Sequence, residues 1–381
     1  MTYFTFGEGY SGVYQSQVIE VCEYLNQLTD VNIRLISFVS IRNFFANRKK
    51  IKENYTYSIV IPMLPKASTW KLNLPILVIL SIFLKEKKFI CRNVKATVLV
   101  LYMKKIGWAK IVCMDGRGAY AAEQTEYLNK EKTNTELYSY LEKKAVLGSD
   151  FRIAVSTQLV RYWKKNYSYQ GDDHVIIPCT VKANDTTKAF SNEKCVRAKK
   201  DLGFSNSDIL MVYSGSLAEW QSFDLLNSFL EKMLRNNSHS GILFLSKNHE
   251  TIEKLTREFP RQVARRWVEP DEVYDYLSVC DYGLLIREES ITNRVAAPTK
   301  FAEYLLAGLS IVISESIGDY SDFVRINKCG YAVKKLDELD FKLDTLTQKK
   351  KDKNQQLAKN YFTKKSKINT EKYKILIKML A

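Results

Sequence analysis

The stretch that decides the fold is Tyr282–Ser314, YGLLIREESITNRVAAPTKFAEYLLAGLSIVIS. It begins with a short apolar run typical of a buried strand and ends with a second one, Leu309–Ser314, and the segment between them predicts a helix over Thr299–Ala307. Pro298 suits the first turn of that helix, where its missing N–H costs nothing, and Gly308 suits its C-terminal cap. A strand, a helix and a strand in this order indicate a parallel βαβ unit.

The same alternation of strand and helix extends from this stretch through the whole chain. Further strands in the C-terminal half are expected at 209–214, 241–245 and 264–268, with helices at 223–235, 250–258 and 272–280. In the N-terminal half, strands are expected at 3–6, 32–39, 57–62, 89–92, 110–114, 152–156 and 174–178, with helices such as 15–28 and 137–147. Residues 181–207 are polar and lack a strand pattern, which predicts a linker near 180–190. The sequence therefore predicts two doubly wound α/β domains in tandem.

The composition is that of a globular chain. Of the 381 residues, 46% are hydrophobic and 12% are aromatic, too many for a disordered or collagen-like protein. The seven cysteines are scattered and never spaced as C-x-x-C. This argues against a disulfide framework and against structural zinc, and it favours a reducing compartment.

The net charge of +16 is concentrated at the two ends of the chain. Residues 1–150 carry +8, residues 151–348 carry −1 and residues 349–381 carry +9. The last segment predicts a Lys-rich helix with a narrow apolar face that should dock on the rest of the protein, formed by Tyr373, Leu376, Ile377 and Leu380. So much base suggests nucleic acid as a partner, but the sequence contains no recognisable DNA- or RNA-binding motif.

The longest apolar run, Leu74–Leu84 (LPILVILSIFL), is about half of the roughly 20 residues needed to cross a bilayer. It predicts either a buried helix or a helix that lies on a membrane surface. The charged residues at 85–88 mark an ordinary exposed helix end, so the buried alternative is favoured. Met1–Phe6 already has the pattern of a strand, and no signal peptide is expected.

Three of the fifteen glycines follow the first expected strand, as Gly7, Gly9 and Gly12 in FGEGYSGVYQSQV. The G-x-G-x-x-G spacing is that of dinucleotide-binding loops, but the acidic residue expected about 20 residues further on is missing. A loop where a substrate approaches the backbone is favoured over NAD binding, and a plain tight turn is the remaining alternative.

Charged side chains gather around the start of the helix expected at Thr299–Ala307. Lys300 and Glu303 are three residues apart, so they project from one face near the positive N-terminal end of the helix. Arg287 follows the preceding strand, and ligands in open α/β sheets bind beyond the carboxyl ends of strands. Two cations suit a diphosphate, and a carboxylate can accept both hydroxyls of a ribose. The set predicts a nucleotide-sugar site, with an exposed ion pair as the alternative.

The same stretch, with VYSGSLAEWQ (212–221) before it and IGDYSDFV (317–324) after it, resembles the donor half of GT-B glycosyltransferases. It is most similar to family-4-like enzymes of bacterial surface polysaccharide assembly, and the P-T-K-x-x-E-Y-L-x-A-G run (298–308) is the most specific part. The resemblance implies two Rossmann-like domains that face each other across a cleft. The acceptor domain would be 1–182, the donor domain 183–360, and a C-terminal helix, 361–381, would cross back to the first domain.

On this resemblance Glu303 is the ribose ligand, and Lys300 and Arg287 lie where the donor phosphates and sugar would be. The remaining donor-binding positions, which include backbone groups for the diphosphate and the base, are Gly215, Ser216, Val268, Pro298 and Thr299. The chain departs from the family pattern at Val295, where a second glutamate is expected, and at LAEWQ (217–221), where basic residues are common. The phosphate charge must then be met by Arg287, Arg294 or Lys300.

In the first domain, the polar groups expected nearest the reaction are Asp115 and Arg117, in the loop CMDGRGAY (113–120). Arg92 ends the neighbouring strand and would share that wall. The glycine-rich loop would add the acceptor-side residues Glu8, Gly9 and Gly12. An Asp-Gly turn with a solvated arginine is the alternative. No histidine base is expected in this domain, because the histidines at 174, 239 and 249 come later.

The resemblance implies a glycosyltransferase that moves a sugar from a nucleotide-sugar donor, with a UDP-sugar favoured, to a lipid-linked or growing surface polysaccharide acceptor. No metal or other cofactor is expected. A retaining transfer mainly needs electrostatic stabilisation of the departing diphosphate and the oxocarbenium-like sugar, which fits a site rich in cations and poor in bases. We expect a cytoplasmic enzyme on the inner face of the membrane, with its basic first domain and tail toward anionic lipid. The alternatives are a GT-B-shaped epimerase or phosphorylase and a nucleic-acid-binding protein.

Overall fold

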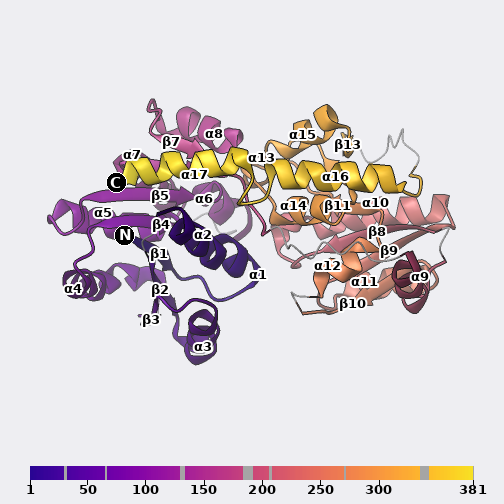
Figure 1. Cartoon of the computed structure of the whole chain (residues 1–381), viewed down its shortest axis with the longest axis horizontal. Helices are drawn as coiled ribbons and strands as arrows, with labels where there is room; N and C mark the ends of the chain where they lie inside the picture. Colours follow the sequence, from indigo (N-terminus) through magenta and orange to yellow (C-terminus); the bar gives the residue numbers. More distant parts are fainter. Residues whose placement is uncertain are drawn as a thin grey trace. The chain divides into compact units, whose positions relative to one another are not determined.

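The structure is a computed structural model that describes residues 1–29, 32–64, 67–128, 134–182, 192–205, 208–269, 272–334 and 343–380. The chain forms two compact units (Figure 1). Unit 1 comprises residues 1–182 together with 367–381, and unit 2 comprises residues 183–366. Most of the linker expected near 180–190 lies outside the described residues. No helix in the described ranges is long and apolar enough to span a bilayer.

Unit 1 contains a sheet of seven parallel strands in the order β3-β2-β1-β4-β5-β6-β7. The strands are β1 (Thr2–Phe6), β2 (Arg34–Ser40), β3 (Ser58–Met63), β4 (Lys88–Arg92), β5 (Ile111–Gly116), β6 (Phe151–Ala154) and β7 (His174–Ile176). All seven were predicted from their apolar runs, because strands covered by helices on both faces are hydrophobic along their length.

Helices connect the parallel strands of unit 1, as crossover connections require. They are α1 (Gly12–Tyr14), α2 (Glu20–Thr29), α3 (Phe44–Asn54), α4 (Leu74–Leu84), α5 (Val94–Lys105), α6 (Tyr120–Glu123), α7 (Thr135–Gly148) and α8 (Thr157–Tyr167). Short turns add η1 (Gln15–Ile19) and η4 (Gln124–Leu128), both π-helical, and the 3₁₀ turns η2 (Ile41–Asn43) and η3 (Ala67–Asn73).

The last helix of the chain, α17 (Lys367–Leu380), packs into the core of unit 1. Three residues of its predicted apolar face, Tyr373, Leu376 and Leu380, are buried there. The rings of Tyr373 and Tyr24 meet edge to face at 5.2 Å between centroids, and the Tyr24 hydroxyl lies 2.7 Å from that of Thr370. The apolar face therefore docks against α2.

Helix α4 does not have the burial that the sequence favoured. Of its eleven residues only Leu77 and Ser81 are buried, although all the others are apolar. The buried alternative for this segment is therefore wrong, because four of its apolar residues are exposed and five more are only partly buried.

Unit 2 contains a six-stranded parallel sheet in the order β10-β9-β8-β11-β12-β13. The strands are β8 (Ile209–Ser214), β9 (Ser240–Leu245), β10 (Val263–Arg266), β11 (Tyr282–Leu285), β12 (Ser310–Ser314) and β13 (Gly330–Val333). The helices are α9 (Asn192–Asp201), α10 (Phe223–Asn236), α11 (Glu250–Glu258), α12 (Val273–Ser278), α13 (Ile291–Val295), α14 (Thr299–Leu306), α15 (Tyr320–Asn327) and α16 (Gln348–Tyr361), with a 3₁₀ turn η5 (Glu219–Gln221). The short edge strand β13 was not predicted.

Helix α14 is held by its local sequence and by one close approach to the sheet. Pro298 is the residue before its first turn, one position earlier than expected, and Gly308 adopts a φ of +89° just beyond its end. Gly283 of β11 lets the helix pack tightly, because a Cβ there would lie 2.2 Å from the ring of Tyr304. The βαβ unit inferred from the sequence is therefore present, with helix α13 in its first connection.

The basic tail divides between the two units. Helix α16 belongs to unit 2, where the Asn354 amide donates to the carbonyls of Gly308 and Leu309, while α17 belongs to unit 1. Unit 1 holds 30 Lys and Arg against 16 Asp and Glu, a charge of +14, and unit 2 holds 28 against 26, a charge of +2. The basic tail therefore does not join unit 1 as a whole, but unit 1 still carries most of the charge.

Candidate active site

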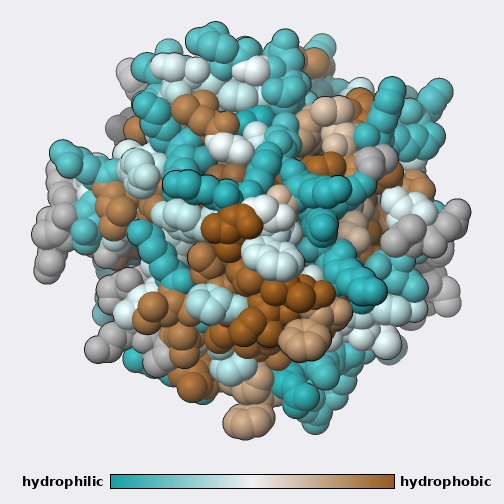
Figure 2. Space-filling model, turned by 90° about the vertical axis from the view of Figure 1, so that its left-hand side faces the viewer, coloured by the Kyte–Doolittle hydropathy of each residue, from teal (hydrophilic) through white to brown (hydrophobic). Residues whose placement is uncertain are grey.

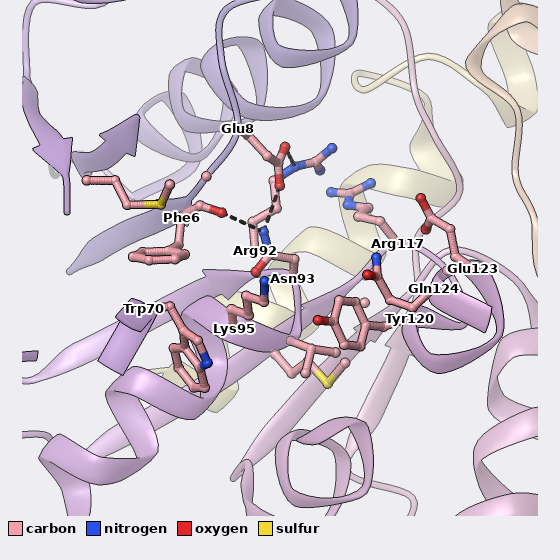
Figure 3. A pocket seen from close by; sticks show the side chains of 16 residues that line it. Phe6, Glu8, Trp70, Arg92, Asn93, Lys95, Arg117, Tyr120, Glu123 and Gln124 are labelled. Carbon is pink, nitrogen blue, oxygen red and sulfur yellow. Dashed lines mark hydrogen bonds and ion pairs between the residues drawn. The ribbon is translucent and has the colours of Figure 1, made fainter. Parts of the chain in front are cut away.

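A cavity of about 570 Å³ lies in unit 1, where the strand order of the sheet reverses between β1 and β4. Ligands bind at this position in open α/β sheets. Figure 3 shows Phe6 and Trp70 on one side of the cavity and Arg117, Glu123 and Gln124 on the other. The cavity is therefore the candidate binding site of unit 1.

Glu8 and Arg92, both predicted from the sequence, face each other in the wall of this cavity. The Arg92 Nε lies 2.7 Å from Glu8 Oε2, and the Asn93 amide donates to Glu8 Oε1 at 3.1 Å and to the Phe6 carbonyl at 3.1 Å. Burial lowers the pKa of the Arg92 guanidinium, but the attractions to Glu8, Tyr3 and Asp115 together more than offset this, and the net shift is upward. The pair thus joins the ends of β1 and β4.

Asp115 lies behind the cavity wall, contrary to the expectation that it is nearest the reaction. Its side chain is fully buried and accepts a hydrogen bond from the Tyr3 hydroxyl. It binds Arg117 through Nε at 2.8 Å and Nη2 at 2.9 Å, and Arg92 Nη1 is 3.8 Å away. The Arg117 side chain is only 15% exposed, so the alternative of a solvated arginine also fails. Asp115 is a positioning residue for two arginines that line the cavity.

Gln17 is a further positioning residue that the sequence did not reveal. It is buried in the π-helical turn η1, accepts from Arg117 Nη1 at 3.4 Å and donates to the Thr180 carbonyl at 2.8 Å. π-Helical turns are often found at functional sites. Gln17 therefore links Arg117 in the cavity wall to the backbone of Thr180.

The rest of the glycine-rich loop does not line the cavity. Gly9 packs against Asn47, whose side-chain oxygen would be 3.0 Å from an added Cβ and accepts from the Tyr10 amide at 2.6 Å. Gly12 begins α1, with the Ser11 hydroxyl as N-cap. Beyond Gly7 and Glu8, the loop therefore contributes no residue to the cavity wall.

Helix α6 and turn η4 supply the third wall, with Tyr120, Glu123 and Gln124. The amides of Tyr120 and Ala121 donate to the buried carboxylate of Glu142 at 3.1 and 2.8 Å, and the Tyr167 hydroxyl donates to it at 2.9 Å. A carboxylate that binds the first amides of a helix fixes where the helix begins. Glu142 thereby holds this wall in place.

Stability should depend on pH through Glu142. Burial raises the pKa of its carboxyl from about 4.5 to about 7, although its hydrogen bonds act in the opposite direction. The folded protein keeps this proton between pH 4.5 and 7 while the unfolded chain releases it. The stabilisation of the folded state by this proton is therefore fully present below pH 4.5 and is lost as the pH rises through 7. The change in the free energy of unfolding is on the order of 3 kcal/mol. In urea unfolding at pH 5 and pH 8, Glu142→Gln should gain stability relative to the wild type at the higher pH. If the stability of both proteins changed by the same amount between the two pH values, Glu142 would not be the source of the pH dependence.

In unit 2, the candidate site lies at the switch point between β8 and β11. Arg287 follows β11 and is buried. Its backbone amide donates to the Ser314 hydroxyl at 2.9 Å, and its Nη1 donates to Asn293 Oδ1 at 3.4 Å. Asn293, which sequence reasoning missed, is itself fixed by donating to the Glu288 carbonyl at 3.1 Å. The guanidinium is thus held at the carboxyl edge of the sheet.

Lys300 and Glu303 form the predicted pair on α14, with Nζ and Oε2 2.6 Å apart and each side chain a little under 30% exposed. The helix is tied to the end of β8, because the Ser214 amide donates to the Tyr304 hydroxyl at 2.8 Å. Burial raises the pKa of that hydroxyl, and Glu303 adds to the rise while Arg287 opposes it. Glu303 and Arg287 are therefore both near enough to influence the same tyrosine.

The other predicted donor-binding positions also lie at this edge of the sheet, but the Gly215 amide does not have its expected role. The Gly215 amide donates to the Leu245 carbonyl at 3.3 Å, so this sheet contact already uses the group expected to meet a diphosphate. Ser216 is exposed, and its carbonyl accepts from the Tyr213 hydroxyl at 2.6 Å. Pro298 and Thr299 are half-buried at the start of α14.

Three further positions bear on what the candidate sites of the two units can contain. Strand β10 ends at Arg266 rather than at 268, so Val268 lies beyond it. In the sheet, β10 is two strands away from β8. Val295 is 2% exposed and cannot replace the missing glutamate. His174 does belong to unit 1, contrary to expectation, but it begins the edge strand β7, 3.1 Å from the Tyr169 hydroxyl. Among the described residues, no cluster of His, Cys, Asp or Glu is arranged to hold a metal.

Solved structures show which fold this is. Sucrose-phosphate synthase from Thermosynechococcus elongatus superposes with a TM-score of 0.72 at 11% identity, covering 100% of this chain and 99% of that one. A glycosyltransferase from Rickettsia africae superposes with a TM-score of 0.70 at 14% identity, covering 99% of this chain and 97% of that one. WaaG, a glycosyltransferase involved in lipopolysaccharide biosynthesis, superposes with a TM-score of 0.61 at 12% identity, covering 98% of each chain. A putative UDP-N-acetylglucosamine 2-epimerase from Listeria monocytogenes superposes with a lower TM-score of 0.58 at 8% identity, covering 99% of this chain and 94% of that one. The chain has the GT-B fold, as predicted.

A family model narrows the class further. Residues 230–373 match the C-terminal domain of the glucosyltransferase 3-like family. A search of curated proteins gives no match. The fold and this domain together identify the chain as a GT-B glycosyltransferase, so the predicted resemblance and enzyme class are confirmed.

Proposed function

We propose that the protein transfers a sugar, with retention, from a nucleotide-sugar donor to a lipid-linked or growing surface polysaccharide. A UDP-sugar is the favoured donor. The observation that carries the proposal is the half-buried Lys300–Glu303 pair on α14, together with buried Arg287 at the same edge of the sheet. The two cations suit a diphosphate, and Glu303 suits a ribose. In this proposal the cations meet the phosphate charge without a metal.

The cavity of unit 1 supports a carbohydrate acceptor. Arg92 and Arg117 are balanced by Glu8 and Asp115, so the walls offer polar groups with little excess charge. Trp70 and the carboxyl and amide groups of η4 and α6 suit sugar rings and hydroxyls. The charge of +14 on unit 1 supports a cytoplasmic enzyme that works at the inner face of the membrane, in the assembly of capsule, O antigen or exopolysaccharide.

A thermal-shift screen of UDP, GDP, dTDP and ADP with their sugars tests the donor class. A ligand that binds only the folded state stabilises it by about 2.7 kcal/mol at one hundred times its Kd, so one base should raise the melting temperature by several degrees. No shift with any nucleotide at millimolar concentration would overturn the donor assignment. Turnover of the sugar nucleotide with no acceptor present would instead indicate the epimerase or phosphorylase alternative.

A further inference from the structure

Helix α4 is apolar on nearly every side, and much of this apolar surface is exposed. Figure 2 shows a hydrophobic patch on the face of the protein that carries this helix. The patch side of η3 and α4 exposes Leu72, Pro75, Ile79, Ile82 and Phe83, which recur at helical spacing, with Phe83 81% exposed. The opposite side buries Asn73, Leu77 and Ser81. A surface helix normally points its apolar stripe inward, so this outward stripe indicates an apolar environment outside the protein.

Basic residues border the stripe at its C-terminal end. The turn after α4 exposes Lys85 and Lys87, and the loop between α5 and β5 exposes Lys105, Ile106, Trp108 and Lys110. The two segments are neighbours, because the Lys110 amide donates to the Lys87 carbonyl at 2.7 Å. Together with the stripe they are called here the α4 surface.

The α4 surface has a strong excess of positive charge. Its exposed charged side chains are the lysines at 85, 87, 105 and 110, and Glu86 is the one acidic residue within 72–88 and 105–110. Glu86 is 14% exposed and binds the amino terminus at 3.0 Å and Arg34 at 2.6 Å, so it does little to balance the nearby lysines. A second copy of this chain would bring the same lysines toward one another, whereas an anionic lipid surface offers both negative headgroups and an apolar interior.

We propose that the α4 surface lies in the interface of an anionic bilayer, with Ile79, Ile82 and Phe83 at the boundary of headgroups and acyl chains and the lysines against the headgroups. This inference rests on the proposed action at a membrane and names the surface that makes the contact. The 3₁₀ turn that leads into α4 carries Trp70, which lines the cavity, and Leu72, which is 60% exposed. An acceptor whose lipid stays in the bilayer would therefore meet the cavity beside the anchoring helix.

Vesicle sedimentation with Phe83→Asp tests the inference. The matched control is Ile326→Asp, an equally exposed apolar residue (77%) on α15 in unit 2. The wild type and Ile326→Asp should bind phosphatidylglycerol vesicles more strongly than phosphatidylcholine vesicles and retain part of that binding in 1 M NaCl. Phe83→Asp should bind at least about tenfold more weakly and lose the salt-resistant part.

Three results would overturn the inference. They are equal binding by wild type and Phe83→Asp, no binding by the wild type, and a wild-type dimer in sedimentation equilibrium that Phe83→Asp dissociates without any effect on vesicles. The nucleotide-induced rise in melting temperature, measured on the same variants, separates this test from the proposed function. If Phe83→Asp keeps that rise but loses vesicle binding, both the donor site and the membrane surface are supported.

Discussion

Glu303→Ala is expected to weaken binding of the donor nucleotide about a hundredfold and to leave the protein folded. A hydrogen bond to a charged group contributes about 1.5–3 kcal/mol, and a ribose would present two hydroxyls to this carboxylate. A loss of about 3 kcal/mol corresponds to about two powers of ten in Kd. The carboxylate is 28% exposed and accepts from Lys300, so its removal leaves no deeply buried group unpaired. Calorimetry with the nucleoside diphosphate found by the thermal-shift screen measures the effect.

The chain offers a close control for this experiment. Asp322 and Arg325 on α15 form another i,i+3 ion pair of unit 2, at 2.7 Å, and both side chains are largely exposed. A surface pair of this kind contributes about 0–1 kcal/mol to stability. Asp322→Ala should therefore leave nucleotide affinity unchanged. If Glu303→Ala binds the nucleotide as well as Asp322→Ala does, Lys300 and Glu303 are the ordinary surface pair that the sequence left as the alternative.

The parts of the fold that were predicted correctly are those specified by neighbouring residues. The strand, helix and strand around α14 follow from two apolar runs with Pro298 and Gly308 between them, and the structure places all three within two residues of the expected bounds. The Lys300–Glu303 pair follows from helical spacing alone. The edge strand β13 was missed because its four residues, GYAV, are too short and too little buried to give a pattern.

The supports of the cavity depend on contacts between distant residues, which a sequence does not display. Tyr3 and Asp115 are 112 residues apart, and Gln17 and Arg117 are 100 apart. Nothing in the residues around Gln17 indicates a π-helical turn. For α4, composition suggested burial, but only the packing of α4 on its neighbours decides which face points outward. Both kinds of error concern tertiary contacts rather than the choice of helix or strand.

Asp115→Ala is expected to be the most destabilising of these substitutions, by about 3–5 kcal/mol. The carboxylate is fully buried and is shared by Arg117, Arg92 and the Tyr3 hydroxyl. Its removal would leave the Arg117 guanidinium, which is 15% exposed, without its charge partner. Such a loss should lower the melting temperature of unit 1 by roughly 10 °C. It should also reduce transfer, because two arginines of the cavity wall would be displaced.

Two further variants separate the buried charge from ordinary effects of removing an aspartate. Asp172→Ala removes a carboxylate from the same unit that is 96% exposed and 4.0 Å from Lys164, and it should change stability by less than about 1 kcal/mol. Asp115→Asn keeps an oxygen acceptor for Tyr3 but lacks the charge that balances the arginines, so it should fall between the wild type and Asp115→Ala. Thermal unfolding followed by circular dichroism gives the order of the three. An Asp115→Ala protein as stable as Asp172→Ala would mean that the arginines do not depend on this carboxylate, and that Asp115 does not position the cavity wall.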